Sequence, residues 1–168
     1  MRNAVLAFLT VPLFLTANGA YAETWQVYQE PSHQCHLEYP SSIFMRGNID
    51  DHNFQTFANA VGDISIRIAS RANDGNWTPA EIKAEFIKET GDTLVYDRLK
   101  DDYLVLSGYQ GDNIFYSKIA LSEDRKNLCI MHLSYPTADK LELDAMVTRM
   151  SKSFRAQGHR ISLVENAN

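Results

Sequence analysis

Two cysteines are the most reactive side chains of this 168-residue chain, and each comes just before a nearly repeated pentapeptide. Cys35 precedes HLEYP at residues 36–40, and Cys129 lies three residues before HLSYP at residues 132–136. In an extended strand, each cysteine points to the same side as the following Leu and Tyr and away from the histidine. We therefore interpret the repeat as two similar strand ends. If those strands are neighbours, Cys35 and Cys129 are expected to form one disulfide in the core.

Histidines and aspartates near the start of the chain form a candidate metal site. Imidazole and carboxylate ligands of this kind suit zinc or manganese. Two facts favour a solvated polar turn with surface histidines instead: H-x-x-H in a strand places its two histidines on opposite faces, and the Asp-Asp-His group falls in an expected loop. A divalent-metal-binding protein stays an alternative, and no cofactor is expected. The candidate ligands are His33, His36, Asp50, Asp51 and His52.

Ser107, in LSGYQG, is a candidate nucleophile. It lies in an expected strand, without the preceding glycine and the sharp strand-to-helix turn of a G-x-S-x-G motif. A triad would need His36, His52 or His132 to approach it in the folded protein. A secreted hydrolase with a loop-built active site is therefore kept as an alternative function.

Aromatic residues recur on consecutive expected strands and form a candidate ligand-binding surface. Tyrosine combines apolar area with a polar hydroxyl, and residues two apart in a strand share a face. Core packing explains part of this pattern, and the rest predicts a groove for a peptide or a small amphipathic ligand. The candidate residues are Tyr96, Tyr103, Tyr109 and Tyr116, with Phe115 beside them.

The first 22 residues have the features of a secretory signal peptide. They contain one positive charge, at Arg2, then an apolar run, and the small residues Ala20 and Ala22. We expect cleavage near Ala22 and a periplasmic or secreted protein. The mature chain is expected to form a single α+β domain over residues 23–156 and a polar C-terminal tail over residues 157–168. No later stretch reaches the ~20 apolar residues of a membrane span.

The charge balance is acidic. The chain has 16 Lys and Arg against 21 Asp and Glu, and removing Arg2 with the leader gives 15 − 21 = −6. Nucleic acids and anionic lipids need a basic surface, so the charge excludes them as expected partners. An unknown protein or a small ligand is the partner that the composition permits.

Two helices and a set of antiparallel strands are predicted by the patterning. Thr78, Pro79 and Glu81 form a capping box and Gly91 a helix stop, so residues 79–90 are expected to be helical, with Ile82, Phe86 and Ile87 facing a sheet. Residues 54–72 read as a hairpin and residues 93–136 as a four-strand meander. After Pro136 a second helix is expected, capped by Thr137. Its inward residues are Leu143, Met146 or Val147, Met150 and Phe154. Residues 41–53 read as a loop.

This order of elements resembles the PsbP-like fold. The resemblance rests on CHLEYPSSIF at residues 35–44 and LSYPTADKLELDAMVTRMSKSFR at residues 133–155. The segments IFYSKIALS and MVTRMSKSFR are also similar to a group of uncharacterised exported bacterial proteins. The chain departs from the family in lacking a tryptophan at Ile43 or Phe44 and in having the cysteine pair. The resemblance implies a curved antiparallel β-sheet flanked by two main helices, and an exported, non-catalytic binding or accessory domain.

Overall fold

The computed structural model describes residues 24–32, 35–90 and 93–157. The expected signal peptide and residues 158–168 of the expected tail lie outside the described residues, as do His33 and Gly91.

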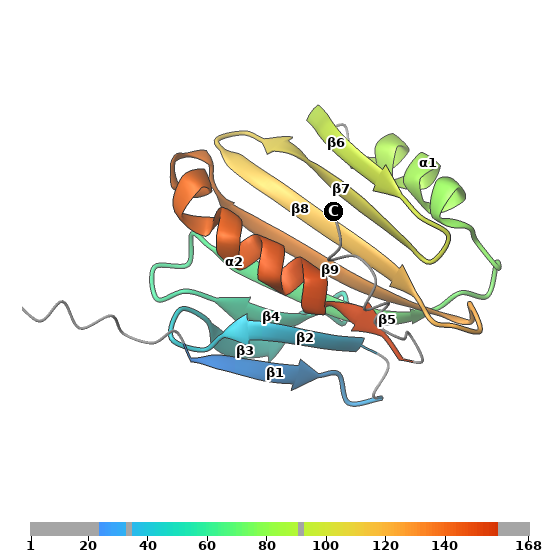
Figure 1. The fold of residues 1–168 in the computed structure, drawn as a ribbon, viewed down its shortest axis with the longest axis horizontal. Coiled ribbons are helices and arrows are strands. Elements are labelled where there is room, and N and C mark those ends of the chain that lie inside the picture. Colours follow the sequence, from blue (N-terminus) through green and yellow to red (C-terminus); the bar gives the residue numbers. More distant parts are fainter. Residues whose placement is uncertain (1–23, 33–34, 91–92, 158–168) are drawn as a thin grey trace, which may run out of the picture.

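The chain folds into a seven-stranded antiparallel sheet, a three-stranded antiparallel sheet and two helices (Figure 1). The large sheet has the order β3-β4-β5-β9-β8-β7-β6, and the small one has the order β1-β2-β10. This confirms the expected α+β fold. The elements are β1 (Trp25–Gln29), β2 (Cys35–Pro40), β3 (Met45–Ile49), β4 (Gln55–Ala58), β5 (Ser65–Ala72), α1 (Pro79–Thr90), β6 (Thr93–Leu99), β7 (Tyr103–Gln110), β8 (Asn113–Leu121), β9 (Asn127–Pro136), a 3-10 turn (Thr137–Asp139), α2 (Lys140–Ser153) and β10 (Arg155–Ala156).

Helix α1 begins with the expected capping box. The Thr78 N–H donates to Oε2 of Glu81 at 2.8 Å, and the Glu81 N–H donates back to Oγ1 of Thr78 at 3.3 Å. Two donors that the first helical turn leaves without a partner are thereby satisfied. Ile82 and Phe86 pack against the sheet as predicted, but Ile87 is 47% exposed, so its predicted inward position is wrong.

Helix α2 starts later than expected. The Thr137 hydroxyl donates to the Asp112 carbonyl at 2.8 Å, and a 3-10 turn separates Thr137 from the helix, so its predicted capping role is wrong. Asp139 occupies the N-cap position without a side-chain hydrogen bond to the helix. The predicted apolar stripe is confirmed: all five of its residues are buried, namely Leu143, Met146, Val147, Met150 and Phe154.

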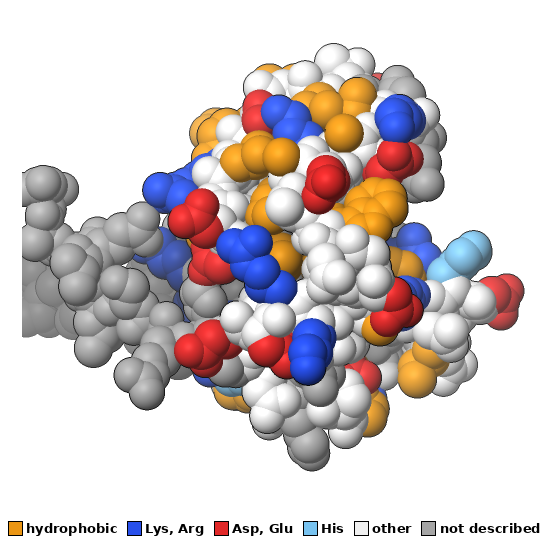
Figure 2. Space-filling model, turned by 90° about the vertical axis from the view of Figure 1, so that its right-hand side faces the viewer, with side chains coloured by type: hydrophobic (Ala, Val, Ile, Leu, Met, Phe, Trp, Pro, Cys, Tyr) orange, Lys and Arg blue, Asp and Glu red, His pale blue; other side chains and the backbone are white. Residues whose placement is uncertain are grey.

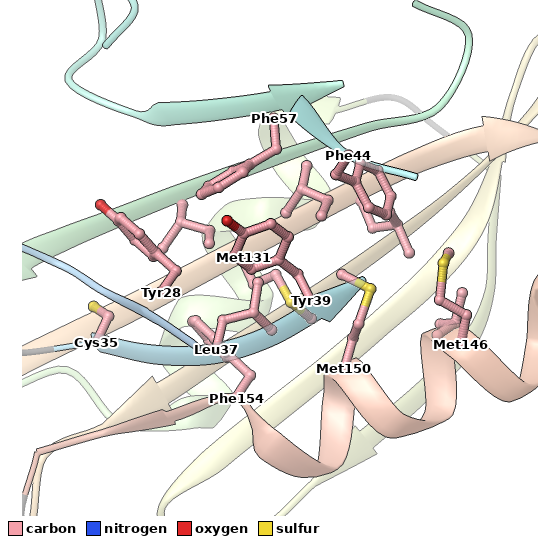
Figure 3. Packing of buried hydrophobic residues seen from close by; sticks show 14 of the residues in the cluster. Tyr28, Cys35, Leu37, Tyr39, Phe44, Phe57, Met131, Met146, Met150 and Phe154 are labelled. Atoms are coloured by element: carbon pink, nitrogen blue, oxygen red, sulfur yellow. The ribbon is translucent and has the colours of Figure 1, made fainter. Parts of the chain in front are cut away.

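Hydrophobic clusters cover both faces of the large sheet. On one face, Leu104 and Phe115 pack beneath Ile82 and Phe86 of α1. On the other, side chains of β5 and β9 meet the small sheet and α2 in the larger core (Figure 3). Because neighbouring strand residues point to opposite faces, the continuous apolar runs of β7 and β9 supply both clusters.

The disulfide joins the two sheets. Cys35 on β2 is bonded to Cys129 on β9, with Cα atoms 5.4 Å apart. The two strands are not hydrogen-bonded neighbours, since β2 pairs with β1 and β10 while β9 pairs with β5 and β8. The expected disulfide forms without hydrogen-bonded neighbouring strands, because inward side chains of two stacked sheets also meet in a core.

Strand β3 falls in the segment expected to be a loop, so that part of the prediction is wrong. All five of its residues are exposed, and among the strands that the structure describes it pairs only with β4. The Gln55 side chain fastens it there, because its Nε2 donates to the Gly47 carbonyl at 2.6 Å and its Oε1 accepts from Nε of Arg46 at 2.9 Å.

Candidate functional site

Four tyrosines from three adjacent strands share one face of the large sheet. Tyr96 on β6 lies opposite Ser107 on β7, and Ser107 lies opposite Tyr116 on β8. Residues directly opposite in an antiparallel pair point to the same side, as do residues two apart in one strand. The tyrosines of β7 therefore join the same side. We call this surface the tyrosine face; it consists of Tyr96, Tyr103, Tyr109 and Tyr116.

The tyrosine face begins where the cover of α2 ends. The Tyr116 hydroxyl lies 2.6 Å from Oγ of Ser151 on α2, and Tyr116 and Tyr103 are half-buried against the larger core. Tyr96 and Tyr109 are 49% and 43% exposed. Exposed and half-buried tyrosines thus lie on the same side of the sheet.

Two cations border the tyrosine face. The Lys118 ammonium lies 4.9 Å from the centre of the Tyr103 ring and donates to the Ser151 carbonyl at 2.7 Å, while the Arg98 guanidinium lies 6.0 Å from the same ring. The sequence reasoning missed both residues. The period of two was the available signal, since Arg98 follows Tyr96 by two positions and Lys118 follows Tyr116 by two.

Burial raises the pKa of two phenols on this side of the sheet, Tyr116 and Tyr135. Loss of hydration raises the pKa of Tyr116, and this outweighs the opposing hydrogen bond from Ser151; Tyr96 and Tyr103 raise it further. Burial, with the nearby Asp144 carboxylate, raises the pKa of Tyr135 on β9 to about 12. The surface thus presents hydroxyls that can donate and accept hydrogen bonds beside apolar rings.

Strand β6 forms one edge of the large sheet. Within the described residues it pairs only with β7, and six of its seven residues are exposed. Its exposed apolar side chains include Val95, Tyr96 and Leu99. An edge strand offers a row of backbone donors and acceptors to an added strand. The tyrosine face and a hydrogen-bonding edge therefore adjoin.

Ser107 does not form a triad with the expected histidines. Its hydroxyl donates to the Phe115 carbonyl at 2.8 Å on the side of Tyr116. His132 lies on the opposite side, where its Nδ1 is 2.8 Å from the hydroxyl of Ser117, a residue only 2% exposed. His36 lies on the small sheet and His52 in the β3–β4 turn.

The four candidate metal ligands that the structure describes are not grouped to hold an ion. His36 lies opposite Gln29 and Arg155, and burial lowers its pKa, with the Arg155 charge adding to the shift. Asp50 stabilises the β3–β4 turn in which it lies. Its carboxylate accepts hydrogen bonds from the Phe54 N–H and the His52 N–H, both at 2.9 Å. It also pairs with Arg67 at 2.6 Å.

The lowered pKa of Asp50 agrees with its role in stabilising the β3–β4 turn. The Phe54 backbone hydrogen bond is the main cause of the lowered pKa of Asp50, with Arg67 contributing. Asp51 and His52 are exposed in the same turn. In the part of the chain that the structure describes, no three His, Cys, Asp or Glu side chains are grouped to hold a metal ion.

Comparison with solved structures gives the class of fold. The solution structure of cyanobacterial PsbP (CyanoP) from Synechocystis sp. PCC 6803 matches with a TM-score of 0.63 at 14% identity, covering 84% of this chain and 97% of that one. The Saccharomyces cerevisiae Ran-binding protein Mog1p matches with a TM-score of 0.54 at 8% identity, covering 83% and 97%. A Bacteroides thetaiotaomicron VPI-5482 structure matches at 0.51 and 13% identity, covering 80% of this chain and 50% of that one.

The chain therefore has a PsbP/Mog1-like fold, as the sequence resemblance implied. No protein-family model and no curated protein matches the sequence.

Two further features concern the setting of the protein. The Cys35–Cys129 disulfide is typical of extracytoplasmic proteins. Neither helix among the described residues has the length and apolar character required to cross a membrane.

Proposed function

We propose that the protein is an exported, non-catalytic binding or accessory domain whose tyrosine face holds a protein partner. The observation that carries the proposal is the shared side of the sheet on which the half-buried Tyr103 and Tyr116 and the exposed Tyr96 and Tyr109 lie. The fold supports it, since the Mog1p that shares it is described as a Ran-binding protein.

Tyrosines are well suited to this role. Each ring contributes a large contact area and loses little side-chain freedom on binding, and the hydroxyl forms a hydrogen bond at the rim of an interface. Tyr116 is already fixed by Ser151, and Tyr103 lies between two cations. A surface that is ordered before binding costs less free energy to use.

The edge strand gives the partner a defined geometry. A segment in extended conformation that pairs with β6 would continue the large sheet and extend its tyrosine-bearing side. Backbone hydrogen bonds to β6 would provide affinity, and side chains resting on Tyr96 would provide specificity. Arg98, on the same side as Tyr96, favours an acidic residue in that segment.

Export is supported by two independent features. Residues 1–22 have the composition of a signal peptide, and the disulfide requires an oxidising compartment to form and persist. The periplasm, or the medium, is where the partner should be sought.

Photocrosslinking in intact cells tests this function. A benzoylphenylalanine at position 109 should give one discrete adduct, and this adduct should disappear when Tyr96→Ser is added. The control carries the same crosslinker at Val61, which is 82% exposed in the β4–β5 loop. An identical adduct at position 61, or none at position 109, contradicts the proposal.

A further inference from the structure

A cavity of about 350 Å³ lies away from the tyrosine face, between the β5–α1 loop, helix α1 and the start of β9. Figure 2 shows the side of the molecule with this loop and helix, where hydrophobic side chains gather with acidic and basic ones beside them. The cavity is lined by apolar groups, with two carboxylates among them. Its lining includes Asp74, Trp77, Ile82, Glu85, Phe86 and Leu128.

The loop holds Trp77 in a fixed position. Asn73 is only 6% exposed, and its Oδ1 accepts from the Trp77 N–H at 2.9 Å while its Nδ2 donates to the Trp77 carbonyl at 3.2 Å. The same Nδ2 donates to the Arg125 carbonyl at 2.9 Å, which ties the loop to the β8–β9 turn. A Cβ on Gly75 would lie 1.8 Å from Nε1 of Trp77, so only glycine admits the indole there.

A rigidly held tryptophan that stays 41% exposed is typical of a binding site. Exposed apolar area costs free energy in water. The hydrogen bonds of Asn73 fix the Trp77 backbone and the indole lies against Gly75, so the ring is positioned before a ligand binds. Phe86 brings a second aromatic ring to the same cavity. The cavity volume is near the lower end for small-molecule pockets, which fits a ligand of few non-hydrogen atoms.

The charges of the cavity select a cation. Asp74 and Glu85 are the acidic residues among those that line it. Glu85 also forms an ion pair with Lys88 at 2.6 Å, but the Lys88 side chain is 68% exposed and the pair lies at the surface. Such pairs are weak, so a cation delivered into the cavity can replace the Lys88 ammonium.

We propose that this cavity binds a small organic ammonium ion. Aromatic rings attract such cations through their negative faces, and nearby carboxylates add charge complementarity. The alkyl groups of an alkylated ammonium ion can contact the apolar lining of the cavity, whereas the water shell of a hydrated metal ion cannot. The site is independent of the tyrosine face.

Tryptophan fluorescence measures this binding directly. The chain has two tryptophans, so Trp25→Phe leaves Trp77 as the reporter. Choline chloride is the probe. The matched control is 3,3-dimethylbutan-1-ol, the neutral isostere in which carbon replaces the choline nitrogen. Choline should change the Trp77 emission saturably, with a half-saturating concentration at least about fivefold below that of the neutral compound.

Three charge variants give opposite, diagnostic results. Asp74→Asn with Glu85→Gln should raise the half-saturating choline concentration about tenfold. Lys88→Gln should lower it, because Glu85 is then unpaired. Glu142→Gln, an exposed carboxylate in the first turn of α2, should leave it unchanged.

A second method keeps the test independent of the reporter. In proton nuclear magnetic resonance spectra, the protein should broaden the choline signals. Trp77→Leu should abolish this broadening and leave the far-ultraviolet circular dichroism spectrum unchanged. Equal affinity for the neutral compound, no effect of the paired Asp74 and Glu85 changes, or no saturable response to choline overturns the proposal.

Discussion

Removal of the Cys35–Cys129 disulfide should destabilise the domain strongly without changing its fold. The bond closes a loop with a sequence separation of 94, so in the unfolded chain it excludes many open conformations. The chain-entropy relation gives about 4.6 kcal/mol for a loop of this length. At about 2–4 °C per kcal/mol for a domain of this size, the melting temperature should fall by about 9–18 °C.

The burial of the two cysteines determines how the disulfide must be reduced. Cys35 and Cys129 are 1% and 0% exposed, so the folded protein shields the bond from reductant. The protein should therefore be unfolded, reduced, and refolded with reductant present. Circular dichroism melting curves of the oxidised and reduced wild type then compare identical side chains.

The control is the Cys35→Ala/Cys129→Ala variant. It should melt near the reduced wild type, and reductant should not shift its curve. A decrease of less than about 1 kcal/mol in the free energy of unfolding on reduction would refute the reasoning. So would alkylation of two free thiols in native protein isolated without reductant.

Three further predictions concern the core, a helix cap and one phenol. Met150→Ala, at a fully buried site on α2, should cost about 2–5 kcal/mol in urea unfolding, whereas Leu141→Ala, 89% exposed on the same helix, should cost almost nothing; equal costs contradict the packing of α2. Thr78→Ala removes the capping box and should cost about 1 kcal/mol, and an unchanged urea midpoint argues against the cap. Tyr135 should ionise near pH 12 in absorbance titrations, and Tyr135→Phe should remove this late phase; because its pKa is raised above 10.0 in the folded state, the stability it contributes is full below pH 10 and is lost as the pH rises toward 12.

The parts of the fold that the sequence predicted are those with local signals. The capping box of Thr78 and Glu81 marks the start of α1 through contacts three residues apart. The β6–β9 meander has short polar turns between apolar runs, and consecutive strands pair. The shared side of the four tyrosines results from strand periodicity in the same way.

The parts that could not be predicted depend on contacts between distant residues. Strand β3 has no buried residue and hence no alternation; it is a strand because Gln55 and the β4 backbone hold it. The division into two sheets depends on the pairing of β2 with β10, whose residues are more than a hundred positions away. Trp77 passed unnoticed because its position depends on Asn73, whose side chain also donates to the carbonyl of the distant Arg125.

The affinity of the captured partner for variants of the tyrosine face tests the central claim most directly. With the crosslinked partner purified, Tyr96→Ser/Tyr109→Ser should raise its Kd at least about thirtyfold at an unchanged melting temperature. The matched control, Val61→Ser/Leu141→Ser, removes two exposed apolar side chains elsewhere and should leave Kd within about twofold. Equal Kd values for the two double variants would show that the partner binds elsewhere.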